Sequence, residues 1–502
     1  MRDRPGSHRV DVSLSAVPQP VETGADEAAP YCIALLGDFS ARAHRGAVEG
    51  TQAIASREPL VVDRDTVDTL LARLRPELEI RTREGDPPLR VRFTEIADFH
   101  PDRLYERLPL FEGVRELRRR LTESDDVTKR PRTGPAPGPP PAASGATPRT
   151  GSLLDQVVEQ SATNQEAPSP LEGGDLQAYL NRLVAPYAVP AADPRRQAVL
   201  AQLDRAAESG MRALLHHPEF QALEGLWRGV HLLTQRNESE ATVQFYLVDV
   251  SKTELAADQD EHAEIQDSAI YQLLARPPGA APEARWAALG GLYSFGPESR
   301  DLALLGHLGA VARRLGAPWI AAAEPRLAGC ESIEETPDPS DWTGAPDPGW
   351  EALRKSREAP WIGLAWPRFL LRLPYGRHGT WCEALQLEEV SDGSPSDEYL
   401  WGNPAVACLL LLAARAADPS TSPGMNLEIE GLPLHLAAGP GGAGATPGAE
   451  VLLGERAAQR LLDRGLMALA SVRGTDRIRL VRFQSIARPA APLAGLAGAT
   501  AG

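Results

Sequence analysis

The order of apolar and polar positions in the first quarter of the chain predicts short strands. Residues 9–17, RVDVSLSAV, alternate apolar and polar side chains, which indicates a half-buried strand. Residues 31–39, YCIALLGDF, form an apolar run that reaches Gly37-Asp38, which predicts a buried strand entering a turn. Residues 89–96, LRVRFTEI, predict another strand.

Apolar residues at helical spacing predict helices between and after these strands. Residues 62–78 carry an apolar stripe that Pro76 ends, and Asp65 is placed to cap its first turn. Residues 98–121 predict further helices, whose inward-facing side chains we expect to be Leu104, Leu108, Phe111, Val114, Leu117 and Leu121. This alternation of strands and helices predicts an α/β or α+β fold for the first half.

A joint rich in Pro, Gly and Ala interrupts the pattern at residues 131–150. It contains seven Pro and three Gly. Proline prevents helix formation and central strand pairing, so we expect an extended, semi-stiff linker. The linker divides the chain into a first domain at 1–130 and a second at 151–490, and we expect a flexible tail at 491–502.

The pattern after the linker again predicts mixed sheets with flanking helices. Residues 152–160, SLLDQVVEQ, form a short amphipathic helix in this interpretation, with its apolar stripe made by Leu153, Leu154, Val157 and Val158. A longer helical region runs through 195–216, and VQFYLVDV at 243–250 predicts a strand. Strands and helices alternate beyond it, so the fold class of the whole chain ranges from α/β to α+β.

Composition narrows the classes of partner. The 502 residues carry a net charge of −16, which argues against a nucleic-acid partner, because phosphates require a basic face. The longest apolar run, 405–414, is too short for direct membrane insertion. The four cysteines show no CxxC spacing, which predicts reduced thiols and a cytoplasmic protein; they are Cys32, Cys330, Cys382 and Cys408.

No catalytic, cofactor-binding or metal-binding residues emerge from the motifs. The sequence contains no phosphate loop of the GxxxxGK[ST] type, no GxSxG elbow and no HExxH. His216 and His217 are adjacent, so on a helix they point in different directions and are poorly placed to share a metal. The acidic stretch 258–264 lacks the spacing of a calcium loop, and the glutamates at 383–389 have no evident base or nucleophile beside them. We therefore expect no enzyme and no cofactor.

Motifs in the first half resemble the small contractile-sheath subunit of the bacterial type VI secretion system. That family has a strand ending in GDF, here Gly37, Asp38 and Phe39, followed by an acidic helix start at 63–68. It then has a DFHP sequence before a leucine-rich helix, here Asp98, Phe99, His100 and Pro101.

Motifs in the second half resemble the large sheath subunit of the same system. The first signature comprises Phe220, Leu223, Glu224, Trp227, Arg228 and Gly229. The second comprises Pro367, Arg368, Leu371, Arg372, Pro374, Tyr375 and Gly376, and the third comprises Trp401, Gly402 and Asn403. In order and with sensible spacing, the resemblance identifies the chain as a fusion of a small and a large sheath subunit.

The signature residues also have a structural interpretation of their own. Phe220, Leu223 and Trp227 lie on one helical face, and Arg228 can pair with Glu224 four residues earlier. Two alternatives stay open for Arg368, Arg372 and Arg377. They are either internal salt-bridge partners that hold the RLPYG turn, or contacts for acidic residues of a neighbouring subunit.

The resemblance implies a structural role in a contractile sheath. In the family, small and large subunits pair and stack helically into a tube around an inner tube, and strands are donated between subunits. Residues 9–17 stand where a donated strand is expected, and 152–160 resembles a helix recognised by a disassembly ATPase. The expected partners are further copies or standard sheath subunits, together with the inner tube, the baseplate and that ATPase.

The resemblance to the large subunit ends near residue 489, where that family continues with a further domain. We therefore expect the fusion to lack the usual C-terminal domain of the large subunit. This leaves an alternative function, a non-polymerising adaptor that caps a sheath or joins it to a baseplate.

Overall fold

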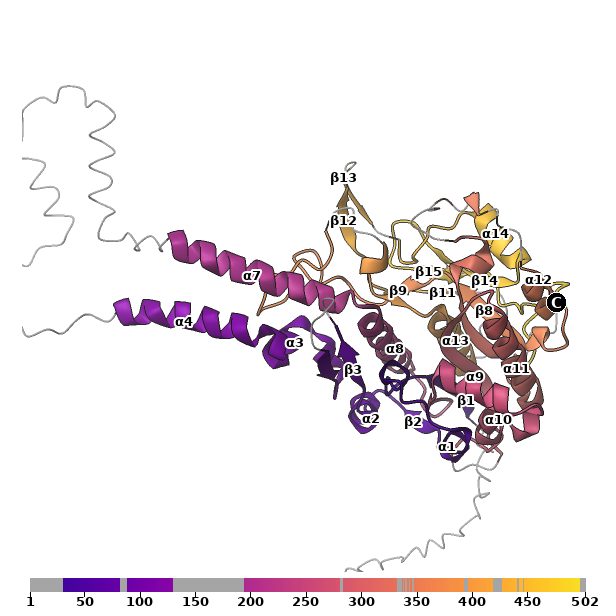
Figure 1. Cartoon of the computed structure of the whole chain (residues 1–502). Helices are drawn as coiled ribbons and strands as arrows, with labels where there is room; N and C mark the ends of the chain where they lie inside the picture. Colours follow the sequence, from indigo (N-terminus) through magenta and orange to yellow (C-terminus); the bar gives the residue numbers. More distant parts are fainter. Residues whose placement is uncertain are drawn as a thin grey trace, which may run out of the picture. The chain divides into compact units, whose positions relative to one another are not determined.

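The computed structural model places β1, a strand from before the linker, inside a sheet built from residues after it (Figure 1). The structure describes residues 30–81, 88–129, 194–279, 283–331, 336, 338, 341–342, 344, 347–391, 396–418, 427–439, 442–445 and 447–496. The predicted strand at 9–17, the linker at 131–150 and the predicted helix at 152–160 lie outside these residues.

Contacts group the chain into two units. The first comprises the described parts of 1–99, 216–380 and 389–502, and the second those of 100–215 and 381–388. This grouping does not follow the linker, because each unit takes residues from both sides of it.

The first unit is built on a nine-stranded sheet with the order β11-β15-β14-β8-β7-β6-β1-β5-β2. Its strands are β1 (Tyr31–Gly37), β2 (Leu60–Val62), β5 (Val243–Asp249), β6 (Trp286–Phe295), β7 (Trp319–Ala323), β8 (Ile362–Trp366), β11 (Glu428–Ile429), β14 (Leu466–Ser471) and β15 (Ile478–Leu480). The strands from β5 through β1, β6, β7 and β8 to β14 are parallel, whereas β2, β15 and β11 pair antiparallel at the two edges.

Strand β1 is buried on both faces, as its continuous apolar run predicts. It pairs in parallel with β5 over its full length, from Tyr31 opposite Val243 to Gly37 opposite Asp249, and with β6 on its other side. The predicted strand at 31–39 is thereby confirmed. Its position inside the sheet, between strands of the second half, means that the two sequence halves share one core.

Helices cover both faces of this sheet. Cys32, Ala34 and Leu36 belong to one buried cluster with Leu305 and Leu308 of α11 (Ser299–Leu315). Successive residues of a strand face opposite sides, and the other side meets α13 (Pro404–Ala417), which packs against β1 and β5–β8. The remaining helices of the unit are α1 (Thr51–Ser56), α2 (Val67–Leu74), α8 (Pro218–Gln235), α9 (Lys252–Glu261), α10 (Ala269–Leu274), α12 (Pro348–Arg354) and α14 (Glu455–Asp463).

Short elements complete the first unit. Three two-stranded sheets pair β3 (Glu77–Ile80) with β4 (Leu89–Arg92), β9 (Phe369–Leu370) with β10 (Trp401–Gly402), and β12 (Leu436–Gly439) with β13 (Gly442–Ala445). The 3₁₀ helices are η1 (Ala43–Arg45), η2 (Ile96–Phe99), η4 (Ile265–Asp267), η5 (Pro325–Ala328), η7 (Ala359–Trp361) and η8 (Ser396–Glu398). The mixed α/β prediction of fold class is confirmed.

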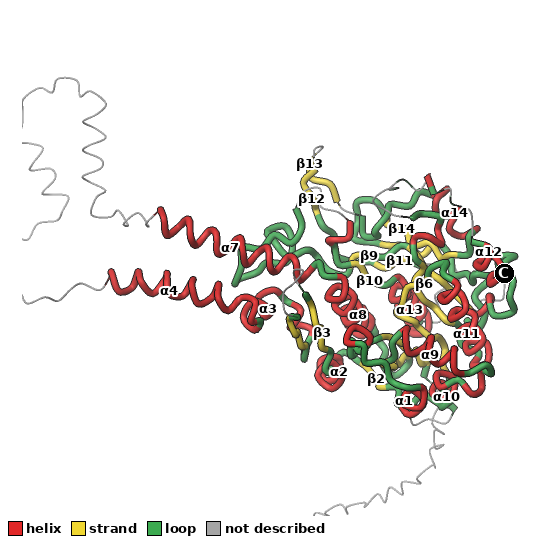
Figure 2. Tube along the Cα trace, in the orientation of Figure 1, coloured by secondary structure: helices red, strands yellow, loops and turns green. Residues whose placement is uncertain are grey.

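The second unit consists mainly of helices. They are α3 (Pro101–Arg107), η3 (Pro109–Phe111), α4 (Glu112–Lys129) and α7 (Pro194–Leu215). The two long helices α4 and α7 run side by side, as Figure 2 shows. The predicted helices at 98–121 and 195–216 are confirmed.

Three details differ from the sequence predictions. Asp65 does not cap α2; the N-cap residue is Thr66, and the Asp63 carboxylate instead accepts the backbone N–H groups of Asp65 and Thr66. Leu117, expected to face inward, is 49% exposed, because it lies at the side of the contact between α4 and α7. Leu493, in the stretch expected to form a tail, is buried, so packed chain continues beyond residue 490.

Candidate functional site

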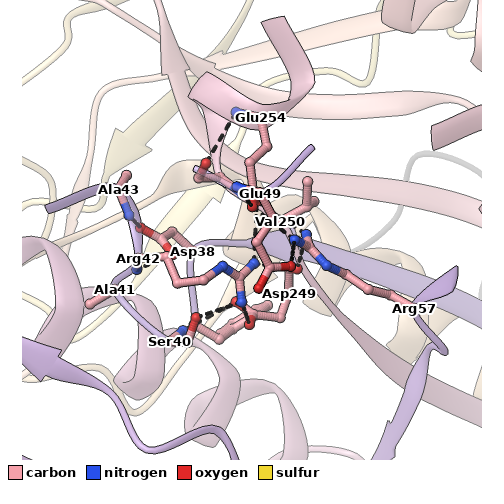
Figure 3. A network of polar contacts seen from close by, with 12 residues as sticks. Asp38, Ser40, Ala41, Arg42, Ala43, Glu49, Arg57, Asp249, Val250 and Glu254 are labelled. Atoms are coloured by element: carbon pink, nitrogen blue, oxygen red, sulfur yellow. Dashed lines mark hydrogen bonds and ion pairs between the residues drawn. The ribbon is translucent and has the colours of Figure 1, made fainter. Parts of the chain in front are cut away.

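A network of charged side chains lies where β1 and β5 end, and it joins residues from both sides of the linker (Figure 3). The loop after β1 is held by Asp38, whose carboxylate accepts the backbone N–H groups of Arg42 and Ala43 at 2.8 and 2.9 Å. This turn directs the Arg42 guanidinium toward the end of β5. Parallel neighbouring strands such as β1 and β5 end at the same edge of a sheet, so the loops that follow them lie next to each other.

Arg42 bridges two acids of the second half. Its Nη1 is 2.5 Å from Asp249 Oδ2, and its Nη2 donates to the Asp249 carbonyl at 3.0 Å and to Glu254 Oε2 at 3.2 Å. Asp249 is the last residue of β5, and Glu254 lies in the first turn of α9. One side chain from before the linker therefore connects a strand and a helix from after it.

Arg57, the residue after α1, completes the network. It donates to both Glu254 oxygens at 2.8 and 3.1 Å, to the Asp249 carbonyl at 2.8 Å and to Glu49 Oε2 at 2.7 Å. Glu254 also belongs to a capping box, in which its carboxylate accepts the Ser251 N–H and Ser251 Oγ accepts the Glu254 N–H. Glu254 is thus fully buried yet surrounded by donors.

The electrostatics keep the network charged at neutral pH. Burial alone would raise the pKa of Glu254, but hydrogen bonds from Arg57, the Ser251 N–H and Arg42 outweigh it and lower the pKa to about 2. For Asp249, burial prevails over Arg42 and raises the pKa of that carboxyl above its usual value. The pKa of Arg42 is raised: burial opposes its charge, but Asp249 and Glu254 favour it more.

A second charged cluster lies inside the first unit and combines signature residues with Glu389. Arg372 donates to both oxygens of Glu224 at 2.8 and 3.2 Å, and to both oxygens of Glu389 at 2.7 and 2.8 Å. Arg228 Nε adds a contact of 2.7 Å to Glu224, and its Nη2 donates to the Tyr375 hydroxyl at 3.1 Å. The Arg372 guanidinium also lies 4.2 Å from the centre of the Tyr375 ring.

Because the cluster is buried, the loss of one of its charges would leave an opposite charge without compensation and lower the stability of the fold. Glu224 is completely buried; burial opposes its charge, but Arg372 and Arg228 lower its pKa. The pKa of Tyr375 is raised to about 12, chiefly by burial. Two arginines face two glutamates, so the charges balance within the cluster.

The partners of Arg368 and Arg372 are acidic residues of the same chain. Arg372 pairs with Glu224 and Glu389, and Arg368 Nε donates to Glu450 at 2.8 Å. Arg377 is exposed and follows Gly376, whose φ of 148° favours glycine. Contact with a neighbouring subunit stays a prediction.

Aromatic residues from both halves meet in the first unit. Trp227 donates its indole N–H to the Phe39 carbonyl at 3.0 Å, and the two rings are 5.5 Å apart. Phe220 makes edge contacts with Phe93 and Phe99, which stack on each other at 4.1 Å. These rings form a buried connection between motifs that lie far apart in the sequence.

Other signature residues shape turns and helix ends. Asp98 accepts the N–H and hydroxyl of Thr94, His100 caps α3 through the Asp102 N–H, and Pro101 starts that helix. Asn403 caps α13 by accepting the Ala405 N–H at 2.9 Å.

The remaining signature residues form turns and a short strand pair. A Cβ at Gly37 would lie 2.9 Å from Leu226 Cδ1, and Trp401 pairs with Leu370 across β9 and β10. Pro367 forms a cis peptide bond with Trp366, and the Pro374 carbonyl accepts the Thr380 N–H.

Two of the residues weighed for catalysis or metal binding lie in segments with clear local contacts. Asp258 accepts the Ser268 hydroxyl and the N–H groups of Ala269 and Ile270, so it stabilises the start of α10. The backbone N–H of Glu383 donates to Asp102. Within the described ranges, no group of three or more His, Cys, Asp and Glu side chains is placed to hold a metal ion. Each of the four cysteines is buried, and none of them forms a disulfide.

Comparison with known proteins decides the family. The model of the EvpB/VC_A0108 tail sheath N-terminal domain matches residues 197–487. The chain belongs to this tail sheath family. A second family model, described as type VI secretion system, VipA, VC_A0107 or Hcp2, matches residues 5–129. The two matches lie on opposite sides of the linker, which supports the predicted fusion of small and large sheath subunits.

One relative extends this assignment. The type VI secretion system sheath protein TssC1 of Pseudomonas aeruginosa (strain PAO1) is 30% identical over 311 residues, which cover 59% of this chain. The chain spans 62% of the length of that relative. Among the described residues of this sheath-family chain, no helix has both the length and the apolar character to cross a membrane.

The charged network around Arg42 was missed in the sequence, although part of its signal is visible there. The Ser251-x-x-Glu254 spacing is that of a capping box, which marks the start of α9 after β5. Nothing in the local pattern indicates that Arg42 and Arg57, about 200 residues earlier in sequence, supply the counter-charges. That pairing depends on β1 lying beside β5.

Proposed function

We propose that this chain is a structural component of a type VI secretion contractile sheath, in which the small and large subunits form one fused protomer. The observation that carries the proposal is the position of β1. This strand precedes the linker, and it lies between β5 and β6, which follow the linker. A small and a large partner thus contribute to one sheet.

The charged network supports the same proposal. Arg42 and Arg57 come from the small-subunit half, and they neutralise Asp249 and Glu254 of the large-subunit half. Fusion fixes a one-to-one ratio of the halves and makes their association intramolecular. The arrangement supports assembly, because the acids of the second half are held by arginine donors of the first half. We therefore propose a role without a catalytic step.

The proposed partners are further copies of this chain or standard sheath subunits. The inner tube, the baseplate and a disassembly ATPase are proposed in addition, with the cytoplasm as the compartment. Head-to-tail contacts that do not close on themselves would extend such protomers into a filament. In this proposal residues 9–17 are the donated strand and Arg377 is a candidate contact with the next protomer.

Electron microscopy of the purified full chain tests the proposal. We expect tubes or stacked rings, either from the chain alone or after mixing with standard small and large sheath subunits. The matched sample is the standard subunits without the chain, which establishes what they form by themselves. Single particles at every concentration, with no incorporation into mixed tubes, would contradict a protomer and favour the adaptor.

Recognition by the ATPase is tested separately with residues 152–160. Leu154→Asp places a charge in the apolar stripe, and we expect it to reduce capture of the ATPase by at least tenfold. Gln156→Asp, on the polar side of the same predicted helix, is the control and should bind as the native chain does. Equal capture by the two variants would remove this segment from the proposal.

A further inference from the structure

Three helices of the first unit, α9, α10 and α11, are joined around one buried carboxylate. Asp258, on α9, is fully buried, and its oxygens accept the Ser268 hydroxyl at 2.8 Å and the N–H groups of Ala269 and Ile270 at 2.7 and 3.0 Å. Ser268 is the N-cap residue of α10. Asp258 therefore fixes the place where α10 begins, because it binds the donors of the first turn of that helix.

Two histidines border this carboxylate. His262 Nδ1 lies 3.0 Å from Asp258 Oδ1, and His307 Nε2, on α11, lies 3.2 Å from Ser268 Oγ. The Ser268 hydroxyl donates its proton to Asp258, so Ser268 Oγ accepts in its contact with His307. His307 therefore carries a proton on Nε2, and its neutral ring joins α11 to the start of α10.

A positive charge on His307 is disfavoured at this position. Burial lowers the pKa of His307 below its ordinary value of 6.5; Asp258 opposes this effect and His262 adds to it. The strands beneath α11, which are β6, β7 and β8, contain no charged residue. The other charged groups on α11 and its neighbours have contacts of their own, namely Lys252 with Asp301, Asp260 with Arg300, Glu358 with Arg313, Glu351 with Arg354, and Arg314 with the Tyr271 ring.

Helix α10 is also a surface on which the first sequence half packs. Helix α1, which precedes the linker, contacts both α10 and α9. Ile54 of α1 shares a buried cluster with Ile270 and Leu273 of α10. Arg276, which follows α10, donates to the Ala55 carbonyl at 2.8 Å. The position of α10 therefore decides how α1 is held.

We propose that Asp258, His262, Ser268 and His307 form an acid-sensitive junction, which holds α10 against α11 at neutral pH and loosens both α10 and α1 when the two rings become charged. A charge on His262 lies beside Asp258. A second charge on His307 is then buried close to the first, and movement of the His307 ring toward water relieves this cost. That movement breaks the contact with Ser268.

The direction of the pH dependence follows from the same contacts. A histidine whose pKa is lowered in the folded chain stabilises it fully at neutral pH, and this contribution is lost as pH falls below 6.5. The inference goes beyond the proposed function, because it concerns a contact between the two halves of one chain and does not depend on sheath assembly.

Hydrogen exchange of the full chain at pH 7.0 and 5.5, corrected for the intrinsic effect of pH on exchange, tests the junction. One proton taken up on opening shifts the opening equilibrium by up to about tenfold for each pH unit, so we expect exchange in residues 269–274 and 51–56 to rise by at least about threefold. Helix α14, which packs on β14 and contains no histidine, is the internal control and should not change.

A matched pair of variants assigns the response to His307. His307→Gln keeps an N–H group that can reach Ser268 Oγ but takes up no proton, so α10 and α1 should exchange alike at the two pH values. His231→Gln is the control: His231, on α8, also has a pKa lowered by burial, and its replacement should leave the native response in α10 unchanged.

Three outcomes would overturn the proposal. The first is a native chain in which α10 exchanges alike at pH 7.0 and 5.5. The second is an equal rise in α10 and α14, which would indicate general loosening of the fold. The third is the same rise in the native chain and in His307→Gln. The first two comparisons use the native chain alone, so they decide the question even if a variant does not fold.

Discussion

Trp227 donates its indole N–H to the backbone carbonyl of Phe39 over 3.0 Å, although 188 positions separate them in sequence. The edge contact between their rings at 5.5 Å adds an aromatic interaction to that hydrogen bond. Phe39 ends the Gly37-Asp38-Phe39 motif, which begins at the last residue of β1, and Trp227 lies on α8. Both are buried, so the pair fastens the first sequence half to the second inside one core.

Arg42→Met should lower the free energy of unfolding by roughly 3 kcal/mol, because it leaves two buried acids with less compensation. Urea denaturation of the full chain measures the change. Arg45→Met, in the same loop, is the control; Arg45 is exposed, and its replacement should stay within about 0.5 kcal/mol. Equal stability of the two variants would show that the network contributes little.

Glu224→Gln should lower the free energy of unfolding by about 3–5 kcal/mol, since it leaves Arg228 and Arg372 with only Glu389 to balance them. Adding Arg228→Gln restores the balance of charge. We therefore expect the double variant to be more stable than the sum of the single changes predicts, by at least about 1 kcal/mol. A double-mutant cycle by urea denaturation measures this coupling, and strict additivity would contradict it.

Stability should fall in acid because of Glu254. Its pKa in the folded chain is about 2, below its ordinary value of 4.5, so its stabilising contribution is complete above pH 4.5 and disappears as pH falls toward 2. The Glu224 carboxyl, whose pKa is also lowered, acts in the same direction. Asp249 has a raised pKa, so its protonation favours the folded chain as pH falls and opposes the effect of the two glutamates.

The urea midpoint at pH 7, 5, 4 and 3 tests this pH dependence. We expect a small change between pH 7 and 5 and a steep loss below pH 4.5. The same series on Glu254→Gln should show a shallower loss, whatever its stability at pH 7. A native chain with the same midpoint at pH 5 and pH 3 would be inconsistent with the lowered pKa values.

Cleavage within 131–150 should leave the two halves associated. Removing the first half would take β1 out of the interior of the sheet and expose the facing edges of β5 and β6. A protease site inserted in the linker, followed by size-exclusion chromatography at micromolar concentration, measures the association. We expect a single peak that contains both fragments, and separate peaks would contradict a shared sheet.

Local pattern predicted elements well where a single periodicity dominates. The apolar run at 31–39 became β1, and the stripe through Phe220, Leu223 and Trp227 became the buried face of α8. Prediction failed where packing against another element decides how far a side chain is exposed. Leu117 continues the apolar spacing of α4, yet it is half exposed because a neighbouring row of α4 side chains makes the contact with α7.

The contacts of the candidate site were likewise predictable only in part. Pairing of Glu224 with Arg228 follows from their spacing of four residues on one helix. Their link to Arg372 depends on how the chain returns after β8 and β9, and local spacing contains no information about that path. The partners of Arg42 were beyond prediction for the same reason.

By itself the sequence determined the apolar strand at 31–37, the main helices and the motifs of both sheath families, because each depends on residues close together in the chain. The tertiary structure alone decided that β1 lies between β5 and β6, and that Arg42 and Arg57 balance the charge of Asp249 and Glu254. The physical reason is that burial of a strand is a local property of its side chains. The choice of its neighbours is set by packing across the whole core.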